Sequence, residues 1–192
     1  MTYRRTSLSQ ALILLCAGAT ASSRAGGFAA PGEPLDAGGR RAAEARRVAD
    51  RFHGRTLTGP AVSARETAAA MGLSASVEPA LAEIDHGAWT GRSFAEIHAE
   101  APEALATWIA DPTAGAPGGE RMADVAVRAG AWLAALPAEP LCAITHPMTI
   151  RCLLADALGL PLPATLGIDL APLAQVRLSF HGRWRLQAIE PA

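Results

Sequence analysis

The chain has 192 residues, a length typical of one domain and long enough to bury a core. Half of its residues are hydrophobic, and 17 basic residues nearly balance 18 acidic ones, giving a formal net charge of −1. No clustered basic patch indicates a nucleic-acid partner, and no segment approaches the roughly 18 consecutive apolar residues of a membrane span. We therefore expect neither nucleic acid nor membrane as a partner.

The first elements admit two interpretations. Residues 1–10 are polar and are predicted to be a flexible N-terminus. Residues 11–16, "ALILLC", form a short apolar run typical of a fully buried strand. The same run, preceded by Arg4 and Arg5, also fits a secretory signal cleaved after Ala21. The residues alone leave both open.

Helices are predicted where apolar residues recur on one face between capping residues. A loop through residue 35 precedes the first of them. The predicted ranges are Asp36 to about Arg51, 64–71 after a Ser63 cap, 94–100, 102–110, about 121–136, and 148–159 with Gly159 as the stop.

Strands are predicted from short apolar or alternating runs. Besides 11–16 they are 56–62, a strand within 75–93, 141–145, and a hairpin of 174–180 with 184–189 around a Gly turn. The alternation of strands and helices predicts an α/β fold: a three-layer α/β/α sandwich with a mostly parallel central sheet, formed by a single domain over 11–192.

The three cysteines, Cys16, Cys142 and Cys152, are odd in number and follow no Cys-x-x-Cys pattern. We expect reduced thiols rather than a disulfide framework. The spacing Cys142-x3-His146-x5-Cys152 resembles a zinc site, but its cysteines fall on an apolar strand and in an apolar helix. No metal and no cofactor are therefore expected.

In such sheets, ligands bind beyond the carboxyl ends of the strands. Two predicted strand ends carry candidate residues, the loop that follows Cys16 and the strand that ends at His146. These ends lie close together if the two strands are neighbours.

Five segments in order resemble the histidine phosphatase superfamily, also called phosphoglycerate-mutase-like. They are "PLDAGGRRAA" (34–43), "GPAVSARETA" (59–68), "LAEIDHGAWTGRSFAEI" (81–97), "PGGER" (117–121) and "AITHPMTIRCLL" (143–154). The resemblance runs from about residue 11 to 189. It implies the fold predicted above and a reaction in which a histidine of an Arg-His-Gly motif accepts a phosphoryl group.

The resemblance also implies roles for four residues of this chain. Glu83 matches the acid that protonates the leaving oxygen, and His146 matches the second histidine that holds the phosphoryl oxygens. Gly18 and Thr20 match the end of the first motif. These residues are the candidates for a retained site.

Other positions depart from the family pattern. Cys16 stands at the first arginine, Ala17 at the nucleophile and Ser63 at the second arginine, while Arg65 is two residues further on. Pro147 follows His146 and has no backbone N–H to offer a phosphate. The chain therefore looks like a degenerate member that lacks the catalytic histidine.

Three functions remain open at this point. The first is a pseudophosphatase or a repurposed small-molecule-binding protein that uses Glu83 and His146; Cys16, Ala17, Gly18, Thr20, Ser63 and Arg65 are then candidate ligand-binding residues. The second is an acid–base enzyme, a lyase or isomerase. The third is an active phosphomonoesterase.

The expected partner is a small molecule, phosphorylated or otherwise anionic, although the neutral replacements also favour a ligand less anionic than phosphate. A homodimer is left open. Cleavage after Ala21 would delete the first strand of the fold, so the resemblance favours residues 11–16 as structure and a cytoplasmic protein. An exported protein is the alternative.

Overall fold

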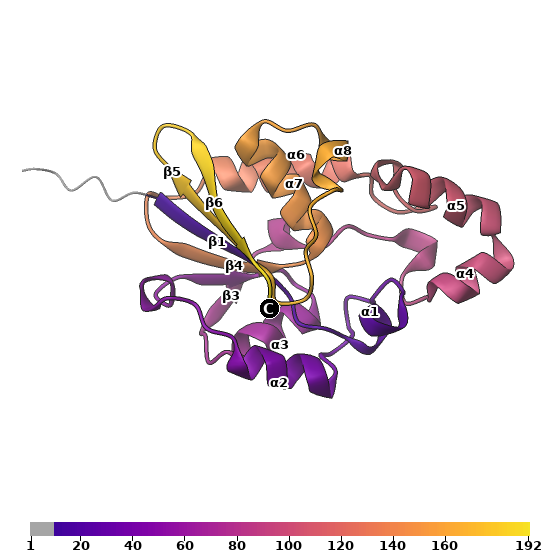
Figure 1. The fold of residues 1–192 in the computed structure, drawn as a ribbon, viewed down its shortest axis with the longest axis horizontal. Helices are drawn as coiled ribbons and strands as arrows, with labels where there is room; N and C mark the ends of the chain where they lie inside the picture. The colour runs from indigo at the N-terminus through magenta and orange to yellow at the C-terminus, as the bar shows by residue number, and fades with distance from the viewer. Residues whose placement is uncertain (1–9) are drawn as a thin grey trace, which may run out of the picture.

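One six-stranded sheet forms the centre of the computed structural model, which describes residues 10–192 (Figure 1). The predicted flexible N-terminus therefore lies almost wholly outside the described residues. The strands are β1 Gln10–Cys16, β2 Thr56–Thr58, β3 Ala75–Val77, β4 Leu141–Thr145, β5 Gln175–Phe180 and β6 Trp184–Glu190.

The sheet has the order β3-β2-β4-β1-β5-β6. The pairs β3–β2, β2–β4 and β4–β1 are parallel, whereas β5 runs antiparallel to both β1 and β6. This arrangement confirms the mostly parallel sheet and the C-terminal hairpin. It also makes β1 a central strand, as the apolar run over 11–16 predicts.

Helices cover both faces of this sheet. Their bounds are α1 Ala21–Ala25, α2 Ala37–Ala45, α3 Val62–Ala70, α4 Phe94–Glu100, α5 Pro102–Ala110, α6 Met122–Ala134, α7 Pro147–Leu158 and α8 Leu162–Thr165. Short 3-10 turns occupy residues 50–52, 79–81, 87–89 and 112–114. The α/β fold with helices on both sides of the sheet is therefore confirmed.

The alternation of side chains along β1 builds two cores. Leu12, Leu14 and Cys16 pack with residues of α6 and α7 on one face. Ile13, Leu15 and Ala17 pack with α3 on the other. Figure 1 shows α6 and α7 above the sheet and α2 and α3 below it. Because both faces of β1 are buried, the strand reads as a continuous apolar run.

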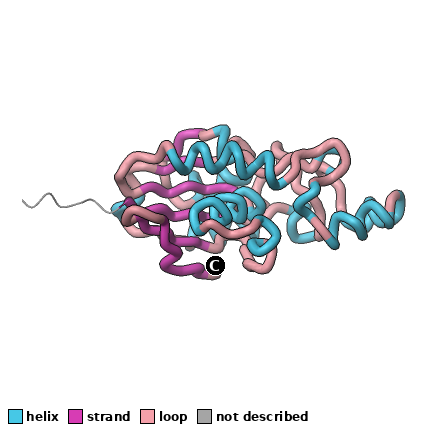
Figure 2. Tube along the Cα trace, turned by 90° about the horizontal axis from the view of Figure 1, so that it is seen from above, coloured by secondary structure: helices cyan, strands magenta, loops and turns pink. Residues whose placement is uncertain are grey.

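A third region extends from the carboxyl-end side of the sheet. Here α4 and α5 form an arm, residues 94–110, that lies beyond the strands in Figure 2. Its core consists of Phe28, Trp89, Ile97, Leu105 and Ala116. The segment after β1 thus packs against residues about seventy positions later in the sequence, and the space between the arm and the sheet becomes available for a site.

Several predicted boundaries are wrong. The helix predicted to Arg51 ends at Ala45, because the chain then turns so that Val48 and Phe52 can pack against β1. The predicted loop through residue 35 contains α1, whose Thr20 cap went unrecognised.

The strand predicted over 56–62 ends at Thr58, since α3 begins at Val62. Ala61, not Ser63, is the N-cap of α3, so Ser63 lies in the first turn of the helix. Its side chain is therefore available for a contact outside its own helix.

Candidate functional site

The carboxyl ends of β1 and β4 lie side by side. Cys16 is in register with Thr145, and the backbone N–H of Ala17 donates to the carbonyl oxygen of Thr145 at 2.7 Å. His146 follows directly as the N-cap of α7. The predicted proximity of the Cys16 loop and His146 is therefore confirmed.

Ser63 reaches His146 from the neighbouring helix. Its Oγ lies 3.0 Å from Nε2 of the imidazole, and Ser63 is only 3% exposed. Desolvation lowers the pKa of His146 to about 4, so the ring is neutral near pH 7. The Nδ1 atom is buried and has no hydrogen-bond partner among the described residues. The imidazole is thus held by Ser63 at Nε2, while its other nitrogen is shielded from solvent.

Glu83 lies at the N-terminus of α7. Its carboxylate oxygens accept the backbone N–H groups of Met148 at 3.0 Å and Thr149 at 3.3 Å. Desolvation raises the pKa of Glu83 to about 7, although these two N–H groups and Arg128 oppose the shift. The carboxyl group can therefore both hold and release a proton near neutrality.

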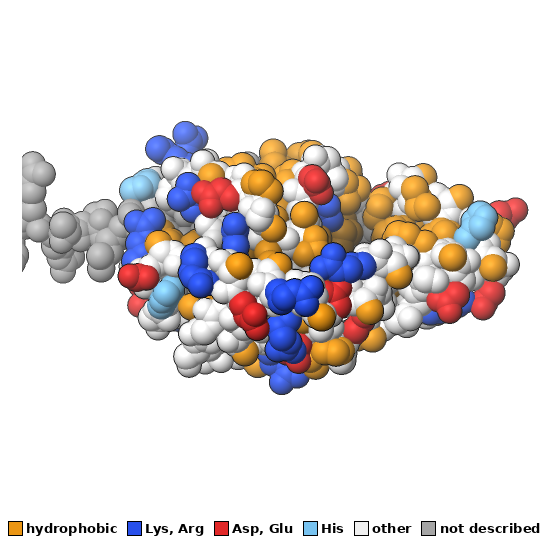
Figure 3. Space-filling model, turned by 60° about the horizontal axis from the view of Figure 1, so that its bottom comes forward, with side chains coloured by type: hydrophobic (Ala, Val, Ile, Leu, Met, Phe, Trp, Pro, Cys, Tyr) orange, Lys and Arg blue, Asp and Glu red, His pale blue; other side chains and the backbone are white. Residues whose placement is uncertain are grey.

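Glu83, Ser63 and His146 all line one cavity of about 590 Å³. Much of the remaining wall is apolar or aromatic and comes from the arm and from several segments that are far apart in the sequence. These lining residues include Phe28, Ala30, Pro31, Pro60, Ala61, Ile84, His86, Phe94, Trp108 and Met148. Figure 3 shows hydrophobic side chains around a recess between the body of the molecule and the arm. This volume and lining are typical of a small-molecule site.

The aromatic wall centres on Phe28. Its ring centroid lies 4.4 Å from that of His86 and 5.0 Å from those of Phe94 and Trp108. Burial lowers the pKa of His86 to about 4, so this ring too is neutral near pH 7. From the sequence, His86 could be either an extra polar group beside Glu83 or part of a hydrated loop, and Trp108 resembles a packing residue. No local pattern could have united them, because they lie on separate segments.

Four of the predicted ligand-binding residues lie at the edge of the β1 end and do not line the cavity. Cys16 and Ala17 are buried at 2% and 4% exposure, and burial raises the pKa of the Cys16 thiol to about 12. The N–H of Gly18 donates to Thr67 Oγ1, and Thr20 caps α1. Their present role is to hold the chain in place.

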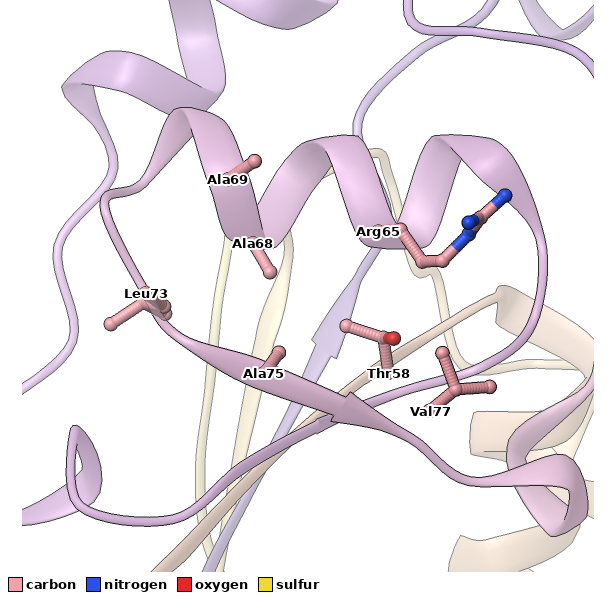
Figure 4. A pocket seen from close by; sticks show the side chains of 7 residues that line it. All are labelled: Thr58, Arg65, Ala68, Ala69, Leu73, Ala75 and Val77. Atoms are coloured by element: carbon pink, nitrogen blue, oxygen red, sulfur yellow. The ribbon is translucent and has the colours of Figure 1, made fainter.

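Arg65 lies elsewhere. It lines a separate, smaller hollow with Thr58, Ala68, Ala69, Leu73, Ala75 and Val77. Figure 4 shows this hollow between α3 and β3. The guanidinium group therefore does not replace the arginine that the family pattern places at Ser63.

The described residues contain neither a metal-binding cluster nor a membrane-spanning helix. No three His, Cys, Asp or Glu side chains within residues 10–192 are grouped so that they could hold a metal ion. Within the same residues, no helix combines the length and the apolar character that crossing a membrane requires.

The whole sequence from residue 12 to 190 matches the histidine phosphatase superfamily, branch 1. The chain belongs to this superfamily. A solved mycobacterial glucosyl-3-phosphoglycerate phosphatase in complex with VO3 superposes with a TM-score of 0.82 and 28% identity over 95% of this chain and all of that one. A putative alpha-ribazole-5'-P phosphatase of Escherichia coli has a TM-score of 0.82 at 20% identity over 95% of this chain and 97% of that one, a likeness of fold alone.

A sequence relative carries the same name as the first of these structures. The glucosyl-3-phosphoglycerate phosphatase of Mycobacterium tuberculosis is 34% identical over 139 residues, 60% of this chain and 61% of that protein. The chain thus spans less than two thirds of the length of this relative. The superfamily proposed from five short segments is confirmed, and the three relatives described above are phosphatases by name.

Proposed function

We propose that this chain binds a small molecule at the carboxyl end of its sheet and has lost the phosphohistidine chemistry of its superfamily. One feature carries the proposal: the family resemblance assigns the position of the nucleophile to Ala17, whose side chain is a buried methyl group. An alanine side chain has no lone pair with which to attack phosphorus. The cavity itself, with its apolar wall, supports retained binding.

The residues that would hold a phosphoryl group are also changed. Cys16 and Ser63 occupy the two arginine positions, and Arg65 faces another hollow. Removal of one preorganised donor from an active site typically reduces the rate by about 10²–10³-fold. Loss of the nucleophile together with the arginines therefore leaves no route to ordinary phosphatase turnover.

Proton transfer is the chemistry that the cavity retains. Glu83, with a pKa of about 7, is a suitable acid, and His146, kept neutral by its pKa of about 4, can accept a hydrogen bond. If the bound molecule is turned over, we propose that Glu83 and His146 act as this acid–base pair. Loss of that turnover in both Glu83→Gln and His146→Ala would support an acid–base enzyme.

A second candidate is a phosphomonoesterase, and the names of the relatives favour it. In that case another group must carry the phosphoryl moiety. His146 is the candidate, because its imidazole lines the cavity beside Glu83. The two candidates therefore differ in a covalent intermediate that can be trapped.

A phosphatase assay separates them. The purified chain is incubated with a panel of phosphomonoesters that includes glucosyl-3-phosphoglycerate, and release of phosphate and acid-labile labelling of the protein are measured. The proposal expects neither above the level of a heat-denatured control. Phosphate release with labelling that disappears in His146→Ala would establish the phosphomonoesterase instead.

A further inference from the structure

The cavity has an excess of acidic side chains. Glu83, Asp85 and Glu120 line it, and Arg128 is the basic side chain among the described lining residues. Arg128 is already paired: its Nε and Nη2 lie 3.3 and 3.1 Å from the two carboxylate oxygens of Glu120. Among the described residues of this wall, neither Glu83 nor Asp85 forms an ion pair, although Arg128 is near enough to lower the pKa of Glu83.

The remaining donors of Arg128 are also committed. Nη1 donates to the carbonyl oxygen of Ala80 at 2.8 Å, and Nη2 also donates to that of Glu83 at 3.2 Å. The guanidinium therefore fixes the backbone within and directly after the 3-10 turn at 79–81. Because these donors already have partners within the protein, Arg128 is not available to bind an anionic ligand.

The N-terminus of α7 offers no place for an anion either. Pro147 has no N–H, Met148 and Thr149 donate to Glu83, and Ile150 donates to the carbonyl oxygen of His146. The helix end that would attract a phosphate is thus occupied by a carboxylate of the protein itself. An anionic ligand would meet that carboxylate at close range.

The aromatic part of the wall suits a different ligand. The rings of Phe28, His86, Phe94 and Trp108 pack against one another and line the cavity. Aromatic faces attract organic cations as well as apolar groups. Carboxylates and aromatic rings that line one cavity are the elements of an ammonium site.

We propose that the cavity binds an organic amine, with its ammonium group directed to Glu83 and Asp85 and its apolar or aromatic body against the wall around Phe28. This inference rests on the proposed function, since it requires that the site no longer accepts phosphate. The ligand would then carry a positive charge, where a phosphate ester carries a negative one. The neutral His146 and Ser63 supply polar contacts without repelling a cation.

Isosteric probes test the sign of this charge. We would titrate the full chain by calorimetry with 2-phenylethylamine, 2-phenylethanol, 3-phenylpropanoate and 2-phenylethyl phosphate, in low-salt buffer about one unit above the pKa of Glu83. The amine is expected to bind about tenfold more tightly than the alcohol, and each anion about tenfold more weakly than the alcohol, as one unpaired charge implies.

Variants locate the effect. Glu83→Gln is expected to weaken amine binding by about tenfold and to change alcohol binding by less than about threefold. Asp85→Asn, at the exposed rim, provides a second carboxylate variant that leaves α7 untouched and should weaken the amine alone by about twofold to threefold. Glu103→Gln, on the exposed face of α5, is the matched control and should change neither affinity.

The outcomes are distinguishable. Equal binding of amine and alcohol, no amine binding at millimolar concentration, or an unchanged amine affinity in both carboxylate variants would overturn the inference. Binding of the alcohol without phosphate release would then leave the proposed function standing. Hydrolysis of 2-phenylethyl phosphate would overturn the proposed function and this inference together.

Discussion

The carboxyl ends of β1 and β4 are neighbours in one parallel ladder, yet only one of them opens into the cavity. At the β1 end, Cys16 and Ala17 turn to opposite faces of the sheet and are absorbed into its two cores. At the β4 end, His146 lines the cavity and contacts Ser63. The backbone register that brings the ends together involves no reactive side chain.

Under the proposed function, this difference explains how the fold would persist after the loss of phosphohistidine chemistry. Small apolar replacements such as Cys and Ala suit a buried strand end and leave the ladder intact. Loss of charged groups also removes the cost of desolvating them. The scaffold is then free to keep its cavity while the ligand changes.

The largest expected effect comes from restoring the β1 end. The triple variant Cys16→Arg, Ala17→His, Ser63→Arg should release phosphate from phosphomonoesters at least about 10²-fold faster than the parent chain, because it regains a nucleophile and two preorganised cations. Phosphate release on the same substrate panel measures this gain.

Its matched control is the same variant with Ala17→Gln, which keeps the arginines but cannot form phosphohistidine. Since Cys16 is buried, a double variant, Ala17→His with Ser63→Arg, spares the core under α7. Circular dichroism establishes that each variant is folded. A parent chain that already matches the triple variant would contradict the proposed loss.

The sequence predicts best where the signal is local. The bounds of α4 and α5 follow from a Ser93–Glu96 capping box and from Pro102 in a first turn. The apolar runs of β1 and β4 predict their burial in the same way. These elements need no knowledge of what packs against them.

The site is predicted only in part, because its contacts join distant segments. Ser63 and His146 are separated by 83 positions, and the Phe28 wall combines the chain after β1 with both helices of the arm. A cavity lined this way has no periodicity or spacing in the sequence. The family pattern indicates Glu83, Ser63 and His146, whereas the aromatic wall is recognisable only in the folded structure.

At the β4 end, the titration of Glu83 should be visible in stability. Its pKa of about 7 exceeds its usual 4.5, so the folded state favours the protonated carboxyl group. The stability that this group contributes is present below about pH 4.5 and is lost as the pH rises through 7, by up to roughly 3 kcal/mol.

Urea unfolding at several pH values, compared with Glu83→Gln, measures this loss. As the pH rises between these two pKa values, the free energy of unfolding of the parent should fall relative to that of the variant. His86 and His146 titrate alike in both proteins, so their contributions cancel in the difference. Glu103→Gln should follow the parent. A constant difference across the range would mean that Glu83 is not desolvated.

A smaller effect is expected at the contact between α3 and the β4 end. Ser63→Ala removes the hydroxyl that lies 3.0 Å from His146 Nε2 and should reduce the free energy of unfolding by about 1 kcal/mol. Ser76→Ala, on the exposed strand β3, is the matched control. If the two variants unfold at the same urea concentration, the Ser63–His146 contact contributes no stability.

The smallest effect is expected from a substitution of Arg65, which lines the small hollow beside β3 and not the main cavity. Arg65 is exposed and faces the hollow beside β3, so Arg65→Ala should change the free energy of unfolding by less than about 0.5 kcal/mol. It should also leave probe binding in the main cavity unchanged, because its guanidinium lines the other hollow. Calorimetry with 2-phenylethylamine and with 2-phenylethyl phosphate checks both signs of charge. A marked loss of phosphate-ester binding would contradict this placement. It would mean that Arg65 supplies the positive charge that the family pattern assigns to the position of Ser63.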